Sequence, residues 1–214
     1  MKQFLIFSSL IIFFIISCDV VGIKGSGNVR NVQRETEYFN QINVSGSFEV
    51  EVVQDDSNTL VIEAEDNLIP YIVTKVRNNT LFIDTNERIS PQEELKVFIT
   101  VSDLKKVDIS GACKVSLKTI EREKLDIELS GASNISVSGK TDEFNLFVSG
   151  ASKIDAVNFY AKNVNAKISG ASRADLNASS NLNADISGAS TINYYGDPAN
   201  IKYNCSGASS LNRR

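Results

Sequence analysis

Apolar and polar residues alternate through the second half of the chain, in blocks that return about every 19 residues. Each block closes on Ser-Gly-Ala, at residues 110–112, 130–132, 149–151, 169–171, 187–189 and 206–208. Three alternate positions before each serine form mostly apolar columns: Lys105, Leu125, Phe144, Val164, Leu182 and Ile201; Val107, Ile127, Leu146, Ala166, Ala184 and Tyr203; Ile109, Leu129, Val148, Ile168, Ile186 and Cys205. Residues at a spacing of two share one face of a strand, so each block predicts a strand with an inward apolar face.

A second alternation follows each Ser-Gly-Ala. Its two apolar columns are Val115, Ile135, Ile154, Ala174, Ile192 and Leu211, then Leu117, Val137, Ala156, Leu176 and Tyr194. Each repeat therefore supplies two short strands, a corner of small residues between them and a looser third side such as residues 138–142. A fixed period of this length is typical of stacked coils. The pattern predicts an all-β parallel solenoid whose interior is a packed core.

Six glycines occupy the predicted corners: Gly111, Gly131, Gly150, Gly170, Gly188 and Gly207. Neighbouring coils stack about 4.8 Å apart, which leaves little room at a tight bend, and glycine tolerates a positive φ there. We expect the corner serine to bond the backbone of its neighbour. A nucleophile elbow would need Gly-x-Ser-x-Gly and a histidine, and this chain contains no histidine. We therefore interpret the corners as structural.

Upstream of the repeats the chain is still β in character but less regular. Residues 39–52 contain a variant corner, Ser45-Gly46-Ser47, followed by strict alternation. Further alternating runs cover residues 60–64, 81–84 and 95–101, with an Asn78-Asn79 turn before the second. We predict longer, earlier coils of the same solenoid here, with one helical turn at residues 66–71 and a loop at residues 90–94.

The first residues have the pattern of a targeting signal. Lys2 precedes an apolar run over residues 4–16 that is too short to span a membrane, and Ser17-Cys18 follows. This resembles the bacterial lipobox. We predict a lipoprotein signal peptide at 1–17, a lipidated Cys18 with a flexible tether at 18–28, and a single solenoid domain at 29–214. The alternative is an ordinary secretory signal with an incidental cysteine.

Composition and charge exclude several classes of site. The chain has 26 Asp and Glu against 22 Lys and Arg, which argues against a nucleic-acid partner because phosphate binding needs a basic stripe. Apart from Cys18, the cysteines are Cys113 and Cys205, four repeats apart, too far for a disulfide. Without histidine or a Cys-x-x-Cys pair, zinc has no ligand set. We predict no cofactor and no metal, and interpret both cysteines as small buried residues.

The variant corner phrase at residues 39–48, the strand at residues 81–83 and the Ser-Gly-Ala repeats resemble the putative auto-transporter adhesin, head GIN domain family of bacterial envelope proteins. The resemblance covers residue 39 to the C-terminus. It implies a right-handed β-helix-like fold and a cell-envelope location, often on a lipoprotein. With a lipid on Cys18, the expected location is the bacterial outer membrane, on either of its faces. The family carries no catalytic residue to transfer.

Three functions fit these observations. The first is a non-enzymatic, adhesin-like or structural module whose outer face contacts a glycan, an envelope protein or the cell wall. The second is a carbohydrate-active enzyme using Asp155 and Asp175, equivalent outward positions on adjacent coils. Lys153 and Arg173 stand two residues before these aspartates, which favours a solvated ladder of ion pairs. The third is calcium-assisted binding at the same aspartates. We predict the first.

Several aromatic residues are predicted to lie on the outside. Phe82, Phe98 and Phe147 fall on outward positions, while Phe159 and Tyr160 fall on the third side of their coil. Large bare apolar patches are uncommon on monomers, so we expect loops such as residues 90–94 to fold over these rings.

Overall fold

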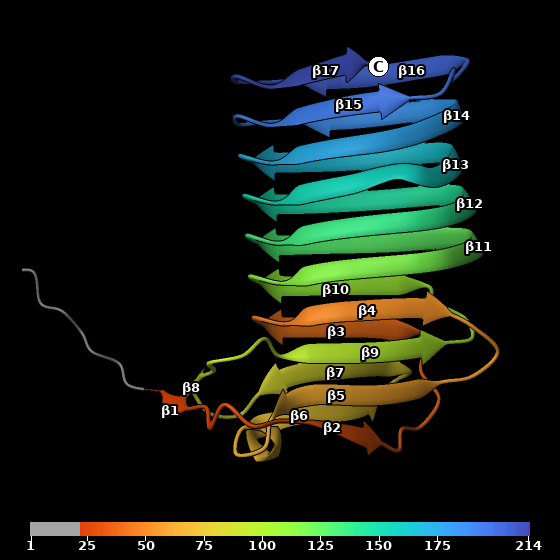
Figure 1. Cartoon of the computed structure of the whole chain (residues 1–214). Coiled ribbons are helices and arrows are strands. Elements are labelled where there is room, and N and C mark those ends of the chain that lie inside the picture. The colour runs from red at the N-terminus through yellow and green to blue at the C-terminus, as the bar shows by residue number, and fades with distance from the viewer. Residues whose placement is uncertain (1–21) are drawn as a thin grey trace, which may run out of the picture.

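Parallel strands stacked on one another make up most of the computed structural model, which describes residues 22–214 (Figure 1). The strands are β1 (Ile23–Lys24), β2 (Val29–Arg34), β3 (Gln41–Gly46), β4 (Glu49–Gln54), β5 (Thr59–Glu65), β6 (Ile72–Arg77), β7 (Thr80–Thr85), β8 (Ile89–Ser90), β9 (Lys96–Val101), β10 (Lys106–Gly111), β11 (Lys114–Gly131), β12 (Asn134–Gly150), β13 (Lys153–Gly170), β14 (Arg173–Ile186), β15 (Thr191–Tyr195), β16 (Asn200–Cys205) and β17 (Ser210–Arg213). A 3-10 helix, η1 (Ile69–Tyr71), lies within the predicted helical turn. The predicted all-β solenoid is confirmed. The predicted signal peptide and Cys18 lie outside the described residues.

The repeats fold as coils in parallel register. Strands β11, β12 and β13 each run from one corner to the next, so each contains the strand after a corner, the third side and the strand before the following corner. The register shifts on the third side, between Leu117 and Ile120 for β11 on β12. Such irregularities absorb the one-residue differences in repeat length. The two flat sides therefore stay in register along the stack.

The corners stack directly on one another. Gly111 pairs with Gly131 in the next coil and with Gly46 in the previous one, so Ser45-Gly46-Ser47 is the first corner of the stack. Gly150 has a φ of +126°, and a Cβ atom at this position would overlap the carbonyl oxygen of Gly131. Positive φ is shared by the corner glycines Gly111, Gly131, Gly170, Gly188 and Gly207. Close stacking and backbone conformation both require glycine at these positions.

A buried ladder of serines runs beside the corners, one residue after each alanine. Its members are Ser133, Ser152, Ser172 and Ser190. The Ser152 hydroxyl accepts a hydrogen bond from the Ser133 N–H at 3.1 Å and donates to the Gly131 carbonyl at 3.3 Å. We expected the corner serines to bond the backbone of the neighbouring coil, and two of them do: the Ser110 hydroxyl donates to the Val44 carbonyl at 3.5 Å, and the Ser169 hydroxyl donates to the Val148 carbonyl at 3.3 Å. The ladder pairs a buried backbone N–H group in each bend that the backbone itself leaves without a partner, whereas the Gly131 carbonyl also accepts from the Ala151 N–H at 2.8 Å.

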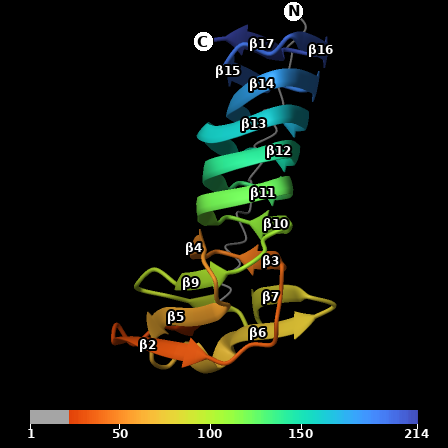
Figure 2. The ribbon, with the colours of Figure 1, turned by 90° about the vertical axis from the view of Figure 1, so that its right-hand side faces the viewer.

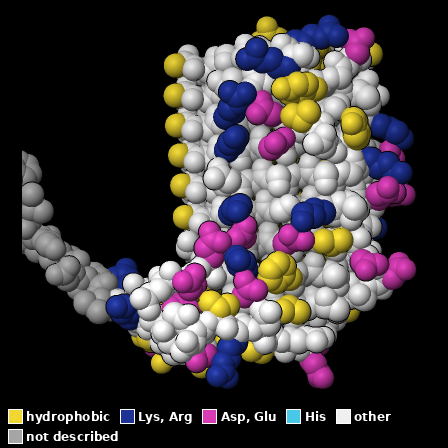
Figure 3. Space-filling model, in the orientation of Figure 1, with side chains coloured by type: hydrophobic (Ala, Val, Ile, Leu, Met, Phe, Trp, Pro, Cys, Tyr) yellow, Lys and Arg dark blue, Asp and Glu magenta, His cyan; other side chains and the backbone are white. Residues whose placement is uncertain are grey.

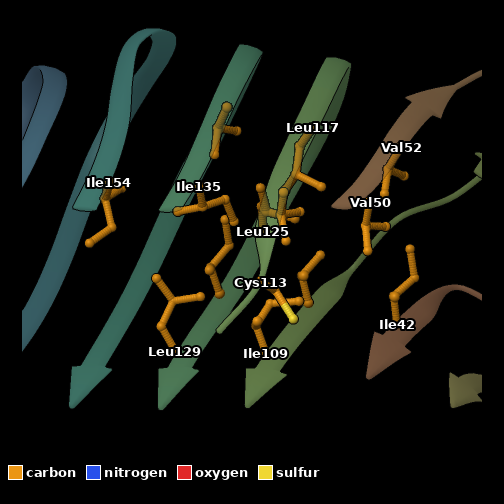
Figure 4. Packing of buried hydrophobic residues seen from close by; sticks show 14 of the residues in the cluster. Ile42, Val50, Val52, Ile109, Cys113, Leu117, Leu125, Leu129, Ile135 and Ile154 are labelled. Atoms are coloured by element: carbon orange, nitrogen blue, oxygen red, sulfur yellow. The ribbon is translucent and has the colours of Figure 1, made fainter. Parts of the chain in front are cut away.

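The apolar columns meet inside the coils and form one continuous core. Side chains from both flat sides interdigitate between the strands, as Figure 4 shows for Ile109, Cys113, Leu117 and Ile135. Phe159, which we placed on the third side of its coil, is fully buried, and its ring packs edge-on against Phe144, with ring centroids 5.2 Å apart. The third side therefore also contributes to the core. Burial raises the pKa of the Cys113 thiol, which makes it a poor nucleophile.

At both ends of the repeat region, side chains in the inward columns are exposed instead of buried. Ile201, Tyr203 and Cys205 are exposed, because β16 pairs with β14 on one edge and the strand opposite it, β17, is short. The prediction that Cys205 is buried is therefore wrong. Lys105 is also exposed, and Leu104 is buried beside it. A side chain in an inward column is buried only where coils cover it on both sides.

The segment before the repeats is only partly solenoidal. Strand β7 pairs parallel with β3, and β9 pairs parallel with β4, which extends the stack as predicted. However, β5 is antiparallel to both β9 and β2, and β6 is antiparallel to β7 (Figure 2). The interpretation of residues 60–64 as a further coil is therefore wrong. Asn78 and Asn79 have positive φ in the turn between β6 and β7, as a tight hairpin requires.

The segment that we assigned to a flexible tether is packed against this end of the stack from Ile23 onward. Strand β1 pairs with β8, and the fully buried Glu65 carboxylate accepts hydrogen bonds from the N–H groups of Gly27 at 2.7 Å and Gln92 at 2.9 Å. A Cβ atom on Gly25 would overlap that carboxylate. Residues 23–28 are thus held by the domain, so any tether is shorter than expected.

Candidate functional site

The strands that precede the corners form one flat face with regular outward columns. One column consists of serines: Ser110, Ser130, Ser149, Ser169, Ser187 and Ser206. The column beside it contains larger side chains: Asp108, Glu128, Phe147, Lys167, Asp185 and Asn204. Because the register is parallel, equivalent residues lie above one another at about 4.8 Å. The face therefore carries a low column of serines and, beside it, a high column of larger side chains.

The difference in height between these two columns creates a groove along the stack. The groove has a volume of about 680 Å³ and is open to solvent. It is lined from Asp108 at one end to Asn204 and Ser206 at the other, and therefore crosses every coil of the repeat region. Its size lies in the range of small-molecule sites, although it is long and shallow rather than enclosed.

Phe147 is an aromatic ring in this groove. Its side chain is 40% exposed and lies between Glu128 and Lys167 of the neighbouring coils. We expected loops to cover these rings, and this expectation is wrong for Phe147, for Phe98, which is 37% exposed on the other face, and for Tyr160, which is 61% exposed on the third side. The ring offers a flat apolar surface among polar groups.

Charges in the groove are mixed, with an excess of carboxylates. Glu128 forms an ion pair with Lys106 at 2.9 Å, and this hydrogen bond raises the pKa of Lys106. Among residues 22–214, Asp108, Lys167 and Asp185 make no ion pair. Their polar groups remain available to a ligand.

A row of hydrogen-bonded side chains stiffens the edge of the groove beyond the high column. The Asn145 side-chain amide donates to Asp126 at 2.8 Å and to Glu143 at 2.9 Å, and Asn165 donates to Asn145 at 2.9 Å. Hydrogen bonds from Asn145 and Lys124 hold the pKa of Glu143 below its usual value. The carboxylates and amides of this row are therefore largely occupied by one another.

The proposed catalytic pair lies on the other face, formed by the strands that follow the corners and drawn in Figure 3. Asp155 and Asp175 are in register on adjacent coils, but Asp155 is exposed whereas Asp175 is buried. Arg173 donates to both oxygens of Asp175 at 3.2 Å, and Asn193 donates to one of them. The predicted ion pair thus forms at this coil.

These contacts determine the protonation state of Asp175. Burial by itself would raise the pKa, but the hydrogen bonds from Arg173 and Asn193 outweigh burial and lower it. A carboxyl group of this kind stays ionised and is a poor general acid. Because its oxygens are already bonded, it is also poorly placed to bind calcium.

The sequence model of the family described as "Putative auto-transporter adhesin, head GIN domain" matches residues 38–198, more than half of the chain. The chain belongs to this family. The match includes both faces of the head GIN domain and most of the groove, although Asn204 and Ser206 lie beyond it. No curated protein sequence matches the chain.

Solved structures share the fold of this head GIN domain. A putative adhesin from Bacteroides fragilis has a TM-score of 0.75 and 22% sequence identity, over 90% of this chain and 100% of that one. A putative lipid binding protein from Parabacteroides distasonis has a TM-score of 0.58 and 22% identity, over 90% and 99%. At this level of identity the likeness shows the fold alone.

Metal sites and membrane spans can be assessed within residues 22–214 of this head GIN protein. No group of three or more His, Cys, Asp or Glu residues there could hold a metal ion. No helix in that range is long and apolar enough to cross a membrane.

The groove was not predicted from the sequence. Its signal was present, since one outward column holds an aromatic ring and unlike charges while its neighbour holds only serine.

Proposed function

We propose that this chain is a non-enzymatic envelope lipoprotein whose head GIN domain binds an envelope or extracellular polymer through its outer surface. The observation that supports it best is the open groove along the stack, which suits a long ligand better than a small substrate. The family, described as adhesin-like, agrees with this function. Stacked repeats commonly present extended binding surfaces.

The non-enzymatic part of the proposal is supported by the state of the stacked aspartates. Catalysis by two carboxylates needs both groups free to act on the substrate, whereas both oxygens of Asp175 are already bonded by Arg173 and Asn193. We expect no shortened oligosaccharides when the purified protein is incubated with bacterial and host glycans and the products are separated by chromatography. Products that disappear in Asp155→Asn or Asp175→Asn would establish the enzyme instead.

Anchoring is proposed through a diacylglycerol and palmitate at Cys18, in the bacterial outer membrane. Cys18 lies five residues before Ile23, where β1 begins and pairs with β8 in a separate two-stranded sheet. The Glu65 contacts hold the residues after β1 against the domain. A lipid at Cys18 would therefore hold the domain by the end that carries β1 and β8 (Figure 1). The repeats and their groove would point away from that attachment.

Anchoring is tested with Cys18→Ser. The variant should lose radioactive palmitate and leave the membrane fraction, because the acyl chains rather than the short apolar run provide stable attachment. Ser17→Ala, which keeps the cysteine and a small residue before it, is the control and should still be labelled. Palmitate labelling of the Cys18→Ser protein would contradict the assignment.

Binding is tested by immobilising the purified protein at low and high density and passing isolated envelope and host polymers over it. We expect weak retention at low density and much stronger retention at high density, because many weak contacts to one polymer act together. Absence of retention at both densities, for every polymer, would refute the proposed function.

A further inference from the structure

We infer that the groove binds a linear, uncharged oligosaccharide chain that lies along the stack, with one sugar ring against Phe147. This inference rests on the proposed function and deepens it by naming the surface and the class of ligand. The groove crosses the coils from Asp108 to Ser206 without interruption. A ligand that follows it must be extended and must present similar groups at regular intervals.

The spacing of the groove residues matches such a ligand. Outward side chains recur once per coil, at about 4.8 Å. A pyranose ring is about as long as one coil is high, so successive sugars in an extended chain would face successive coils. Each sugar would then meet one member of the high column and one serine hydroxyl.

The chemical groups also suit sugars. Asp108, Glu128 and Asp185 accept hydrogen bonds, Lys167 donates them, and serine hydroxyls do both. Sugar hydroxyls need this mixture, because each can donate and accept. The Phe147 ring, 40% exposed, offers the apolar contact that the C–H face of a pyranose can cover.

Other polymers fit less well. The three carboxylates and one amine in the groove would repel nucleic acid and acidic polysaccharides. A peptide that joins a sheet needs an unpaired strand edge, whereas the groove strands from β11 to β14 are bonded to neighbours on both sides. An uncharged glycan is not repelled by the carboxylates and does not need an unpaired strand edge.

The other face provides a matched control. Phe98 is 37% exposed, nearly as much as Phe147, and also lines a hollow, of about 430 Å³. There, however, Lys96 pairs with Glu63 at 3.1 Å, and Lys114 pairs with Glu49. The polar groups near Phe98 are thus bonded to one another, whereas those near Phe147 include Lys167 and Asp185, which are not.

The experiment uses the full-length protein in detergent and an array of linear uncharged oligosaccharides, such as β-1,4-linked glucose and N-acetylglucosamine chains from dimers to octamers. Affinity should rise with chain length and level off when the chain fills the groove. Phe147→Ala should weaken binding by about tenfold or more, equivalent to roughly 1.4 kcal/mol, and Phe98→Ala should leave it unchanged. Lys167→Gln should also weaken binding. Thermal melts should show that all three variants are folded, since these are surface positions.

Two results would overturn the inference. In the first, the wild-type protein retains envelope polymers, as the proposed function requires, but it binds no uncharged oligosaccharide. The inference fails in the same way if wild type, Phe147→Ala and Lys167→Gln bind the oligosaccharides equally well. The proposed function would then survive with a different surface or ligand. The other is equal loss in Phe147→Ala and Phe98→Ala, which would remove the groove as the specific site. If wild type also retains no polymer at any density, the proposed function fails with the inference.

Discussion

Two corner glycines with similar backbone angles differ in what surrounds them. Gly46 has a φ of +111° and Gly150 a φ of +126°. A Cβ atom at Gly46 would meet the Phe48 ring at 3.4 Å, which is an ordinary contact, whereas one at Gly150 would overlap the backbone of Gly131. Gly46 belongs to the first corner of the stack, so no earlier corner crowds it. The two positions separate the conformational role of glycine from its steric role.

We therefore expect Gly150→Ala to cost more than Gly46→Ala. Alanine at either position adopts an unfavourable φ, at a cost of about 1–3 kcal/mol. At Gly150 the overlap with the neighbouring coil adds roughly 1–3 kcal/mol. Denaturant melts measure both free energies of unfolding. Equal losses would mean that backbone conformation alone selects glycine at the corners.

A second residue-scale prediction concerns pH. The pKa of Asp175 is lowered in the folded state by Arg173 and Asn193, so its contribution to stability is present above the unfolded pKa of about 3.9 and is lost as the pH falls through the folded value. Asp175→Asn should be less stable than wild type at pH 7, and the difference should shrink as the pH falls below about 4. Asp155→Asn, at an exposed position, is the control and should have little effect. A difference that stays constant with pH would show that the charge of Asp175 is not what stabilises the fold.

At the scale of elements, the serine ladder joins each coil to the one before it. Ser152 accepts the hydrogen bond of the buried Ser133 N–H, and it also donates to the Gly131 carbonyl, which the Ala151 N–H bonds as well. Ser209, in the last coil, donates to the Ile186 and Ser206 carbonyls but is only half-buried. The same side chain thus serves a buried bend in one coil and a partly solvated bend in another.

Ser152→Ala should destabilise the protein by about 1–3 kcal/mol, because it leaves the buried Ser133 N–H without its hydrogen-bond acceptor. Ser209→Ala should cost less, since water can replace the lost hydroxyl. Thermal or denaturant melts of the two variants test this difference. If both variants lose the same amount, the ladder does not stabilise the stack beyond an ordinary surface hydrogen bond.

At the scale of the whole molecule, stability should vary along the stack. Each coil contacts mainly its two neighbours, so a coil in the middle is held from both sides. Strands β12 and β13 are paired along their length on both edges, whereas β16 pairs with β14 alone and its residues are exposed. The apolar side chains of β16 add little to the core.

Hydrogen exchange should therefore be slowest for amides of β12 and β13 and fastest, among the repeat strands, for those of β16 and β17. Native-state exchange followed by mass spectrometry or NMR measures this gradient. The same experiment on Gly150→Ala should raise exchange in β12 and β13 first, which locates the damage. Uniform protection from β11 to β17 would instead indicate that the stack opens as one cooperative unit.

The sequence by itself determined the repeat region, from the corner at Ser110 to the buried columns of Ile127, Leu146 and Ile168. The reason is that period-two alternation sets the face of every strand, and a constant period of small corners sets the register between coils. The variant corner at Ser45 was found in the same way. Residues such as Phe98 and Phe147 were also placed on the outside correctly.

Tertiary structure alone decided the rest, because alternation is the same in a parallel and an antiparallel strand. It therefore could not show that β5 and β6 turn back, or that Glu65 holds the segment after β1. Exposure depends on neighbouring coils, so the sequence could not tell that Tyr203 lies open while its equivalent Ala184 is buried. The groove beside Phe147 has the same origin: it arises from the heights of side chains in adjacent columns, which meet only when the coils stack.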